Sequence, residues 1–114
     1  MAIVEMHIDA AYFGLIAAGE KRLELRINDP KRASIRIGDT IQFSCRGAEN
    51  KKLLCTVEAM YHAPSFAKLI EVIPLELLGG IDPIKQMDML TEIYAAEEQK
   101  QGVVAFQLTN IRKP

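Results

Sequence analysis

Apolar and polar residues alternate along much of the first 60 residues, which is the pattern of half-buried β-strands. The alternation predicts strands at residues 4–9, 21–27, 40–46 and 53–60. A shorter alternation, carried by Ile35 and Ile37, leads up to a Gly38-Asp39 turn and predicts one more short strand. Between the first two strands, Asp9 can cap a short helix that runs to about Ala18.

The spacing of apolar residues becomes helical in the second half of the chain. Ser65 follows a proline and predicts a helix that ends before Pro74. Asp82-Pro83 is a specific helix start, because aspartate caps the helix and proline suits its first position. We expect this helix to continue to about Gln101 and to bury five residues: Ile84, Met87, Leu90, Ile93 and Tyr94. A last alternating strand is predicted over residues 103–111.

These elements predict one α+β domain over residues 1–114. A run of about five or six short strands in a chain of this length favours a small, partly closed mixed β-barrel with two or three flanking helices. The composition, 49% hydrophobic and 25% charged, is typical of a globular protein with its own core.

The charge and the chain termini limit the classes of partner. A formal net charge of −1 gives no general attraction to nucleic acid, so RNA binding would need a local basic patch. No apolar run is long enough to span a bilayer, and the N-terminus lacks the pattern of a signal peptide. We therefore expect a cytoplasmic protein without membrane contact, monomeric by default.

Two cysteines suggest no disulfide framework. If the hairpin between them is symmetric about Glu49 and Asn50, Cys45 and Cys55 lie opposite each other and could oxidise. In a reducing compartment the simpler interpretation is that both are small core residues. The two histidines have no spacing typical of a metal site, and no cofactor motif is present, so we expect neither a metal nor a cofactor.

Residues 19–26, GEKRLELR, hold most of the candidate chemistry. Strand alternation places Arg22, Glu24 and Arg26 on one face. Two arginines fixed by a carboxylate suit a phosphate or carboxylate ligand. Lys21 has the opposite parity but lies at the start of the strand, where alternation need not hold. The alternative is a solvated face with weak ion pairs.

The chain resembles the ASCH domain, a family with a small PUA-like β-barrel. The resemblance rests on an aromatic-led helix with Tyr12-Phe13, on Gly19, Lys21, Glu24 and Arg26, on Gly38, Asp39, Ile41 and Phe43, and on a closing segment with Ile93-Tyr94 and residues 102–106. It implies a PUA-like barrel and a cleft, lined by Lys21, Glu24 and Arg26, for RNA or a nucleotide. Lys21 would bind phosphate or act as a base, Glu24 would accept hydrogen bonds, and Arg26 would clamp phosphate or stack on a base.

Whether the protein is an enzyme stays open. One branch of the family consists of amidohydrolases that deacetylate N4-acetylcytidine with a lysine, a threonine and a glutamate. Lys21 matches the lysine, but Glu24 stands at the threonine position, so Lys21 and Glu24 would have to be the catalytic pair. The nearest candidates for the third residue are Glu71 and Glu76. A ribonuclease is the other enzymatic alternative.

A basic loop follows the charged strand. Lys31, Arg32 and Arg36 could contact phosphate along one edge, although a solvated charged surface is the simpler interpretation. Three functions are carried forward: binding of RNA or a modified nucleotide, which we favour; hydrolysis of a nucleoside or RNA; and a regulatory module that binds a protein or a small anionic metabolite.

Overall fold

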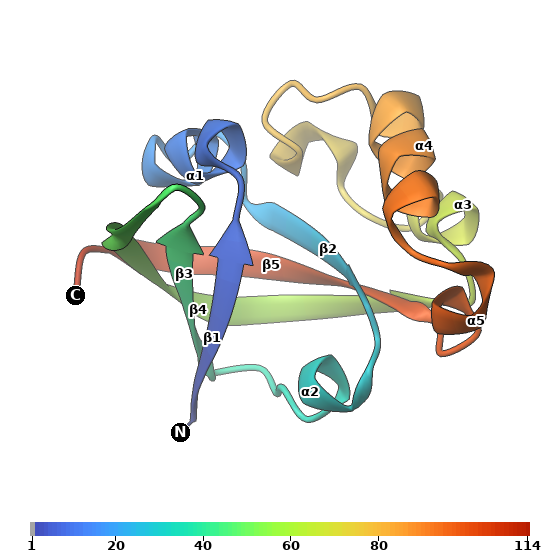
Figure 1. The fold of residues 1–114 in the computed structure, drawn as a ribbon, viewed down its shortest axis with the longest axis horizontal. Coiled ribbons are helices and arrows are strands. Elements are labelled where there is room, and N and C mark those ends of the chain that lie inside the picture. Colours follow the sequence, from blue (N-terminus) through green and yellow to red (C-terminus); the bar gives the residue numbers. More distant parts are fainter. Residues whose placement is uncertain (1) are drawn as a thin grey trace.

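Five β-strands form one sheet that curls into a half-barrel, in a computed structural model that describes residues 2–114 (Figure 1). Their order across the sheet is β1-β3-β4-β5-β2, so β1 and β2 are the two edges. β1 runs parallel to β3, and every other neighbouring pair is antiparallel. The strands are β1 (Ile3–Ile8), β2 (Leu23–Ile27), β3 (Thr40–Cys45), β4 (Ala48–Ala63) and β5 (Val103–Arg112).

Two helices longer than one turn lie on the same side of this sheet. α1 (Ala10–Ala17) connects the two edge strands, and α4 (Pro83–Ile93) lies beyond β2 (Figure 1). The other helices are short: α2 (Pro30–Ala33), α3 (Phe66–Leu69), α5 (Ala96–Gln99) and the 3-10 turn η1 (Leu75–Leu77). The predicted α+β class with a mixed, partly closed barrel is therefore confirmed.

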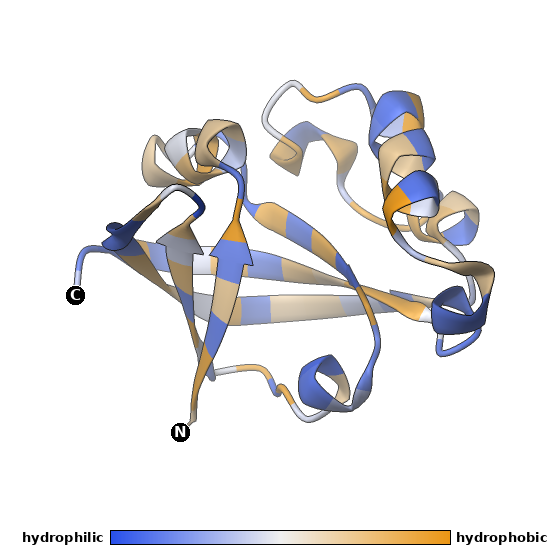
Figure 2. Ribbon diagram, in the orientation of Figure 1, coloured by the Kyte–Doolittle hydropathy of each residue, from blue (hydrophilic) through white to orange (hydrophobic). Residues whose placement is uncertain are grey.

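The core is divided in two by β5, because this strand is buried on both faces. Val104, Phe106 and Leu108 pack with buried residues of α1, β1, β3 and β4. Val103 and Ala105 pack with the apolar residues of β2 and with the helical segment that follows β4. Figure 2 shows the corresponding alternation of hydrophobic and hydrophilic bands along β2. Both parts of the core therefore depend on β5.

The β3–β4 hairpin is tighter than the sequence suggested. A turn at Arg46-Gly47 follows an irregularity in the register after Ser44, so Cys45 lies opposite Ala48 and Cys55 opposite Ile41. The expectation that the two cysteines face each other is thus wrong. Both thiols are free and buried. Burial raises the pKa of Cys55 to about 12, which keeps that thiol protonated at neutral pH.

Residues 35–37 do not form the predicted strand. Asp29 accepts a hydrogen bond from the backbone N–H of Arg32 at 3.0 Å and begins the short helix α2, with Pro30 at its first position. The chain then reaches β3 through a loop in which Ile35 is buried and Ile37 is 66% exposed. The Asp29-Pro30 helix start thus determines the structure of this segment, and the alternation of the two isoleucines is not sufficient to form a strand.

The predicted helix from residue 82 to 101 is interrupted after Ile93. Tyr94 is extended, and its carbonyl accepts a hydrogen bond from the side chain of Gln99 at 2.8 Å. The Tyr94 ring stacks on Phe66, with ring centroids 6.0 Å apart. Ile84 and Ile93 are exposed, against our expectation, while Leu90 is buried. The start at Asp82 is confirmed, since its carboxylate caps the helix.

A close approach at Gly79 positions the start of β2. Gly79 has φ of +75°, and a Cβ there would lie 3.0 Å from the Cβ of Lys21. Lys21 forms an isolated β-bridge with Leu78, and the N–H of Arg22 donates to the Leu77 carbonyl at 2.8 Å. Only glycine allows this packing, because it combines the left-handed conformation with the absence of a side chain.

We expect Gly79→Ala to destabilise the domain by about 1–3 kcal/mol more than Gly80→Ala, because only the first adds a steric clash. Gly80 is the matched control, with φ of +83° and nothing within 4 Å of an added Cβ. Urea unfolding of both variants measures the difference. Equal free energies of unfolding for the two variants would show that the close approach of Lys21 does not exclude a side chain at position 79.

Candidate functional site

Three charged side chains at the start of β2 are buried together. Lys21 is 1% exposed, Glu24 7% and Arg26 9%. One carboxylate oxygen of Glu24 accepts a hydrogen bond from Lys21 Nζ at 2.9 Å, and the other accepts one from Arg26 Nε at 2.8 Å. This charged stretch is therefore an interior ion cluster, and the solvated-surface interpretation of residues 21, 24 and 26 is wrong.

Lys21 joins the cluster because it lies before the regular strand. Its Nζ also donates to the carbonyl of Leu23, so the side chain folds back along the chain. The ammonium group lies 5.6 Å from the centre of the Tyr12 ring on α1. Lys21 therefore connects the carboxylate of Glu24 to the first helix.

Arg26 connects the two edges of the half-barrel. Its Nη2 donates to the carbonyl of His7 on β1 at 2.7 Å, while its backbone belongs to β2. Lys31 makes a second link to the same edge strand, with Nζ 2.5 Å from the carbonyl of Glu5. Side chains thus close the gap between β1 and β2, where backbone pairing between these two strands is not found in residues 2–114.

The cluster keeps its charges. Burial alone would raise the pKa of Glu24, but the adjacent Lys21 and Arg26 outweigh it and lower that pKa below its ordinary value. Burial likewise opposes the charge of Arg26, and the Glu24 carboxylate raises the pKa of that guanidinium. The pKa of Tyr12 is raised by burial and by the nearby carboxylates. At neutral pH the site therefore contains an ionised carboxylate and a neutral phenol.

A cleft of about 90 Å³ opens above this cluster, between α1, β2 and α4. Glu24 and Arg26 form part of its wall, whereas Lys21 lies behind Glu24 and does not line it. The remaining lining comes from β2, the end of β1, the β3–β4 turn, and the two helices with their flanking residues: His7, Ile8, Asp9, Tyr12, Leu25, Arg46, Gln86, Met89, Leu90, Ile93 and Tyr94.

Arg22 lies elsewhere. Its Nε donates to the Leu108 carbonyl at 3.0 Å, and its Nη2 pairs with Glu58 at 3.1 Å, where both side chains are partly exposed. The side chain is directed at β4 and β5, and it is absent from the cleft lining. Its role as a ligand contact is not supported by this position.

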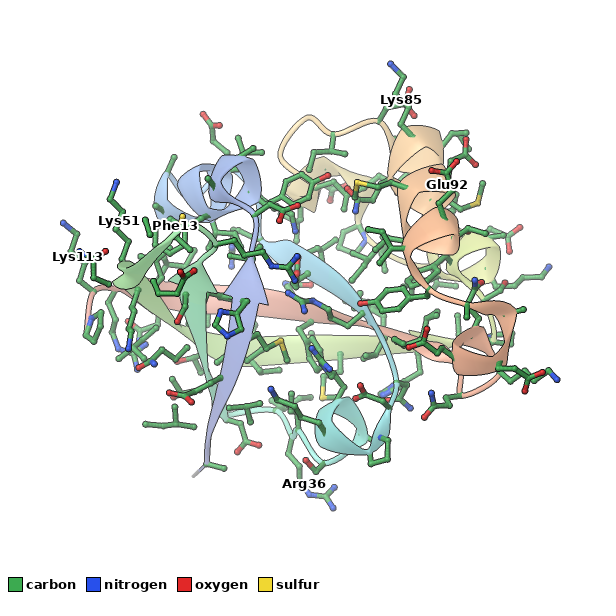
Figure 3. The ribbon with its side chains drawn as sticks, in the orientation of Figure 1. Phe13, Arg36, Lys51, Lys85, Glu92 and Lys113 are labelled. Atoms are coloured by element: carbon green, nitrogen blue, oxygen red, sulfur yellow. The ribbon has the colours of Figure 1, made fainter. Side chains whose placement is uncertain are left out.

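The basic loop is also separate from the cleft. Arg32 pairs with Asp29 at 2.8 Å, and Arg36 projects outward from the loop between α2 and β3 (Figure 3). With Lys31 directed at β1, none of the three lines the cleft. The two glutamates considered for catalysis are exposed, and the carboxylate of Glu71, in the turn after α3, lies 3.6 Å from Lys68 Nζ. Neither it nor Glu76 lines the cleft.

Sequence reasoning missed the contribution of α4. Gln86 and Leu90 are one helical turn apart and form the buried stripe of that helix. The position of the polar Gln86 on the same face of the helix as the apolar Leu90 was the signal in the sequence that could have indicated this contribution. Within residues 2–114, no group of three His, Cys, Asp or Glu side chains could hold a metal ion, and no helix is long and apolar enough to cross a membrane.

We expect Glu24→Gln to lower the free energy of unfolding at pH 7 by about 3–5 kcal/mol, because it leaves two buried cations without their counter-ion. The lowered pKa of Glu24 means that the carboxylate stabilises the fold above the unfolded-state pKa of about 4.3. This contribution is lost as the pH falls through the folded-state value. The gap between wild type and variant should therefore narrow on acidification.

Glu58→Gln is the matched control for this experiment, since Glu58 also pairs with an arginine but is partly exposed. Its effect should stay within about 1 kcal/mol. Urea unfolding between pH 7 and pH 3 measures both variants. A Glu24→Gln penalty no larger than that of the control would contradict the buried ion cluster.

Comparisons with known proteins identify the family and agree with the fold. The family model described as the ASCH domain matches residues 6–112. The crystal structure of the hypothetical protein PH0355 is 32% identical, with a TM-score of 0.79 over 95% of this chain and 97% of that one. The solution structure of protein PF0455 from Pyrococcus furiosus is 29% identical, with a TM-score of 0.67 over 93% and 94%.

A more distant structure shares the fold. The ASCH protein from Zymomonas mobilis is 14% identical, with a TM-score of 0.70 over 95% of this chain and 67% of that one. A search of curated proteins gave no match. The half-barrel is thus of the ASCH/PUA-like type, as the sequence resemblance implied. Because the family model covers almost the whole of it, this chain belongs to the ASCH domain family.

Proposed function

We propose that this domain binds single-stranded RNA, or a free nucleotide, by taking one base into the cleft above Glu24. The observation that carries the proposal is the ionised, buried carboxylate of Glu24 on the cleft wall, with a tyrosine on each side of the lining. Both Nε and Nη2 of Arg26 contact Oε2, whereas Oε1 accepts one hydrogen bond, from Lys21, and retains a second acceptor position. That position suits an N–H group on the edge of a base.

The aromatic residues support a planar ligand. Tyr12 from α1 and Tyr94 from the end of α4 both contribute to the lining. Tyr94 is fixed on one side by stacking with Phe66, and Tyr12 by a hydrogen bond of its hydroxyl to the sulfur of Met89 at 3.4 Å. Stacking on aromatic side chains is a common way for proteins to hold an unstacked base.

The size of the cleft supports a single base. A volume of about 90 Å³ is far below that of sites for large cofactors. The formal net charge of −1 also argues against an extended phosphate-binding surface. Recognition of one base, with the rest of the strand in solvent, fits both observations.

Arg46 is the candidate phosphate contact. It lies at the rim of the cleft on the β3–β4 turn, with its side chain 63% exposed and 3.6 Å from Asp9. A long, exposed ion pair of this kind is weak, so the guanidinium is free to exchange Asp9 for a phosphate.

We expect nucleoside 5′-monophosphates and short single-stranded RNA to bind at low salt and to shift the amide NMR signals of residues that line the cleft. Arg46→Gln should weaken monophosphate binding several-fold, because one charge-assisted contact is lost, and should leave binding of the uncharged nucleoside unchanged. Titration of a uniformly labelled sample measures both affinities and the location of the ligand.

Arg36→Gln is the matched control, since Arg36 is also an exposed arginine in a loop but points away from the cleft (Figure 3). It should bind like wild type. If the folded protein binds none of these ligands, or if the shifts map to α2 and its loop instead, the proposed cleft is not the binding site.

A further inference from the structure

Gln86 is the one residue of the cleft lining whose buried side chain is left without a partner in the described part of the chain. It is 6% exposed, and its Oε1 makes no hydrogen bond within residues 2–114. Gln86 lines the cleft from α4, and its exposed fraction is similar to that of Glu24, which lines the cleft from β2. A buried polar atom without a partner destabilises the free protein.

The absence of a partner is informative because nearby polar groups are satisfied. Both oxygens of Glu24 accept hydrogen bonds from the cluster, and Arg26 is bonded to Glu24 and to the His7 carbonyl. No protein donor is thus directed at Gln86 Oε1. A ligand N–H in the cleft would supply the missing hydrogen bond.

We propose that Gln86 reads the edge of the bound base and selects bases that carry an exocyclic amino group. This inference rests on the proposed function and names the ligand class of the same site. An amino group has two hydrogens, which match two acceptors: the amide oxygen of Gln86 and the free acceptor position on Glu24. Adenine and cytosine present such a group, whereas hypoxanthine and uracil present a carbonyl oxygen in its place.

The amide of Gln86 also suits the atom beside the amino group. In adenine and cytosine the amino group is next to a ring nitrogen that accepts a hydrogen bond, and a glutamine amide offers an acceptor and a donor side by side. Against uracil or hypoxanthine, both the carbonyl of the base and the carboxylate of Glu24 would be acceptors, and they would repel each other.

The first experiment compares wild-type affinities for matched nucleosides by NMR titration. If the cleft accepts a pyrimidine, cytidine should bind about 5- to 150-fold more tightly than uridine. If it accepts a purine, adenosine should bind more tightly than inosine by a similar factor. Nucleosides are uncharged, so phosphate contacts do not enter the comparison.

The second experiment replaces the amide by an apolar group of similar shape. Gln86→Met should weaken the preference for the amino-bearing nucleoside several-fold and leave only the part that Glu24 supplies. The free domain should unfold at the same or a higher temperature, because a buried unsatisfied oxygen is removed. Gln101→Met is the matched control, since Gln101 is exposed and does not line the cleft. It should keep the full preference. Gln86→Leu, of similar volume, is a second test should the methionine variant not fold.

The possible results separate this inference from the proposed function. Wild-type binding without a preference between amino and carbonyl bases would overturn the inference and leave base binding intact. A preference that is as large in Gln86→Met as in wild type would overturn the role of Gln86. If no nucleoside or nucleotide binds to the folded wild type, both proposals fail.

Discussion

The carboxylate of Glu24, held between Lys21 and Arg26, is the interaction on which the rest of the structure depends. It joins the segment that follows α1 to the edge strand β2, and through Arg26 it reaches the backbone of β1. A half-barrel leaves two sheet edges unpaired, and unpaired edges are open to association with other chains. In this fold the ion cluster occupies the gap between those edges.

Stability alone does not explain an arrangement of this kind. Removing three charges from water is costly, and apolar residues of similar volume often stabilise a protein as well as a buried ion pair does. The cluster instead supplies what apolar residues could not: an ionised acceptor, fixed in direction, at the wall of the cleft. Its two cations hold the carboxylate in place, and Lys21 does so from behind, where a ligand does not reach it.

The sequence predicted the parts of this structure that depend on local chemistry. Alternation located the strands, and the Asp82-Pro83 cap located the start of α4, because these signals lie in neighbouring residues. The resemblance to the ASCH family brought Lys21, Glu24 and Arg26 together, although strand parity alone would have grouped Arg22 with the last two. What decides this difference is the Gly79 contact and the bridge to Leu78, which place Lys21 before the regular strand. The spacing of residues along the sequence does not predict such contacts between distant segments.

The same limit applies to α4 and to the β3–β4 hairpin. Helical spacing continued past Ile93, but the stacking of Tyr94 on Phe66 and the hydrogen bond from Gln99 favoured a break there. The register irregularity after Ser44 moved Cys45 away from Cys55. In both cases tertiary contacts between distant segments outweighed a regular local pattern.

The contrast between Glu24 and Gln86 gives the cleft its functional meaning. The two residues line the same cleft and are buried to a similar degree. Each oxygen of the charged Glu24 has a partner in the ion cluster, whereas the amide oxygen of the neutral Gln86 has none within residues 2–114. An apolar side chain at position 86 would fill the same space without burying an unsatisfied oxygen, and Leu90 does this one turn along the same helix. A retained, unsatisfied amide beside a satisfied carboxylate is the arrangement expected where one group is fixed to orient the site and the other is held open for a ligand.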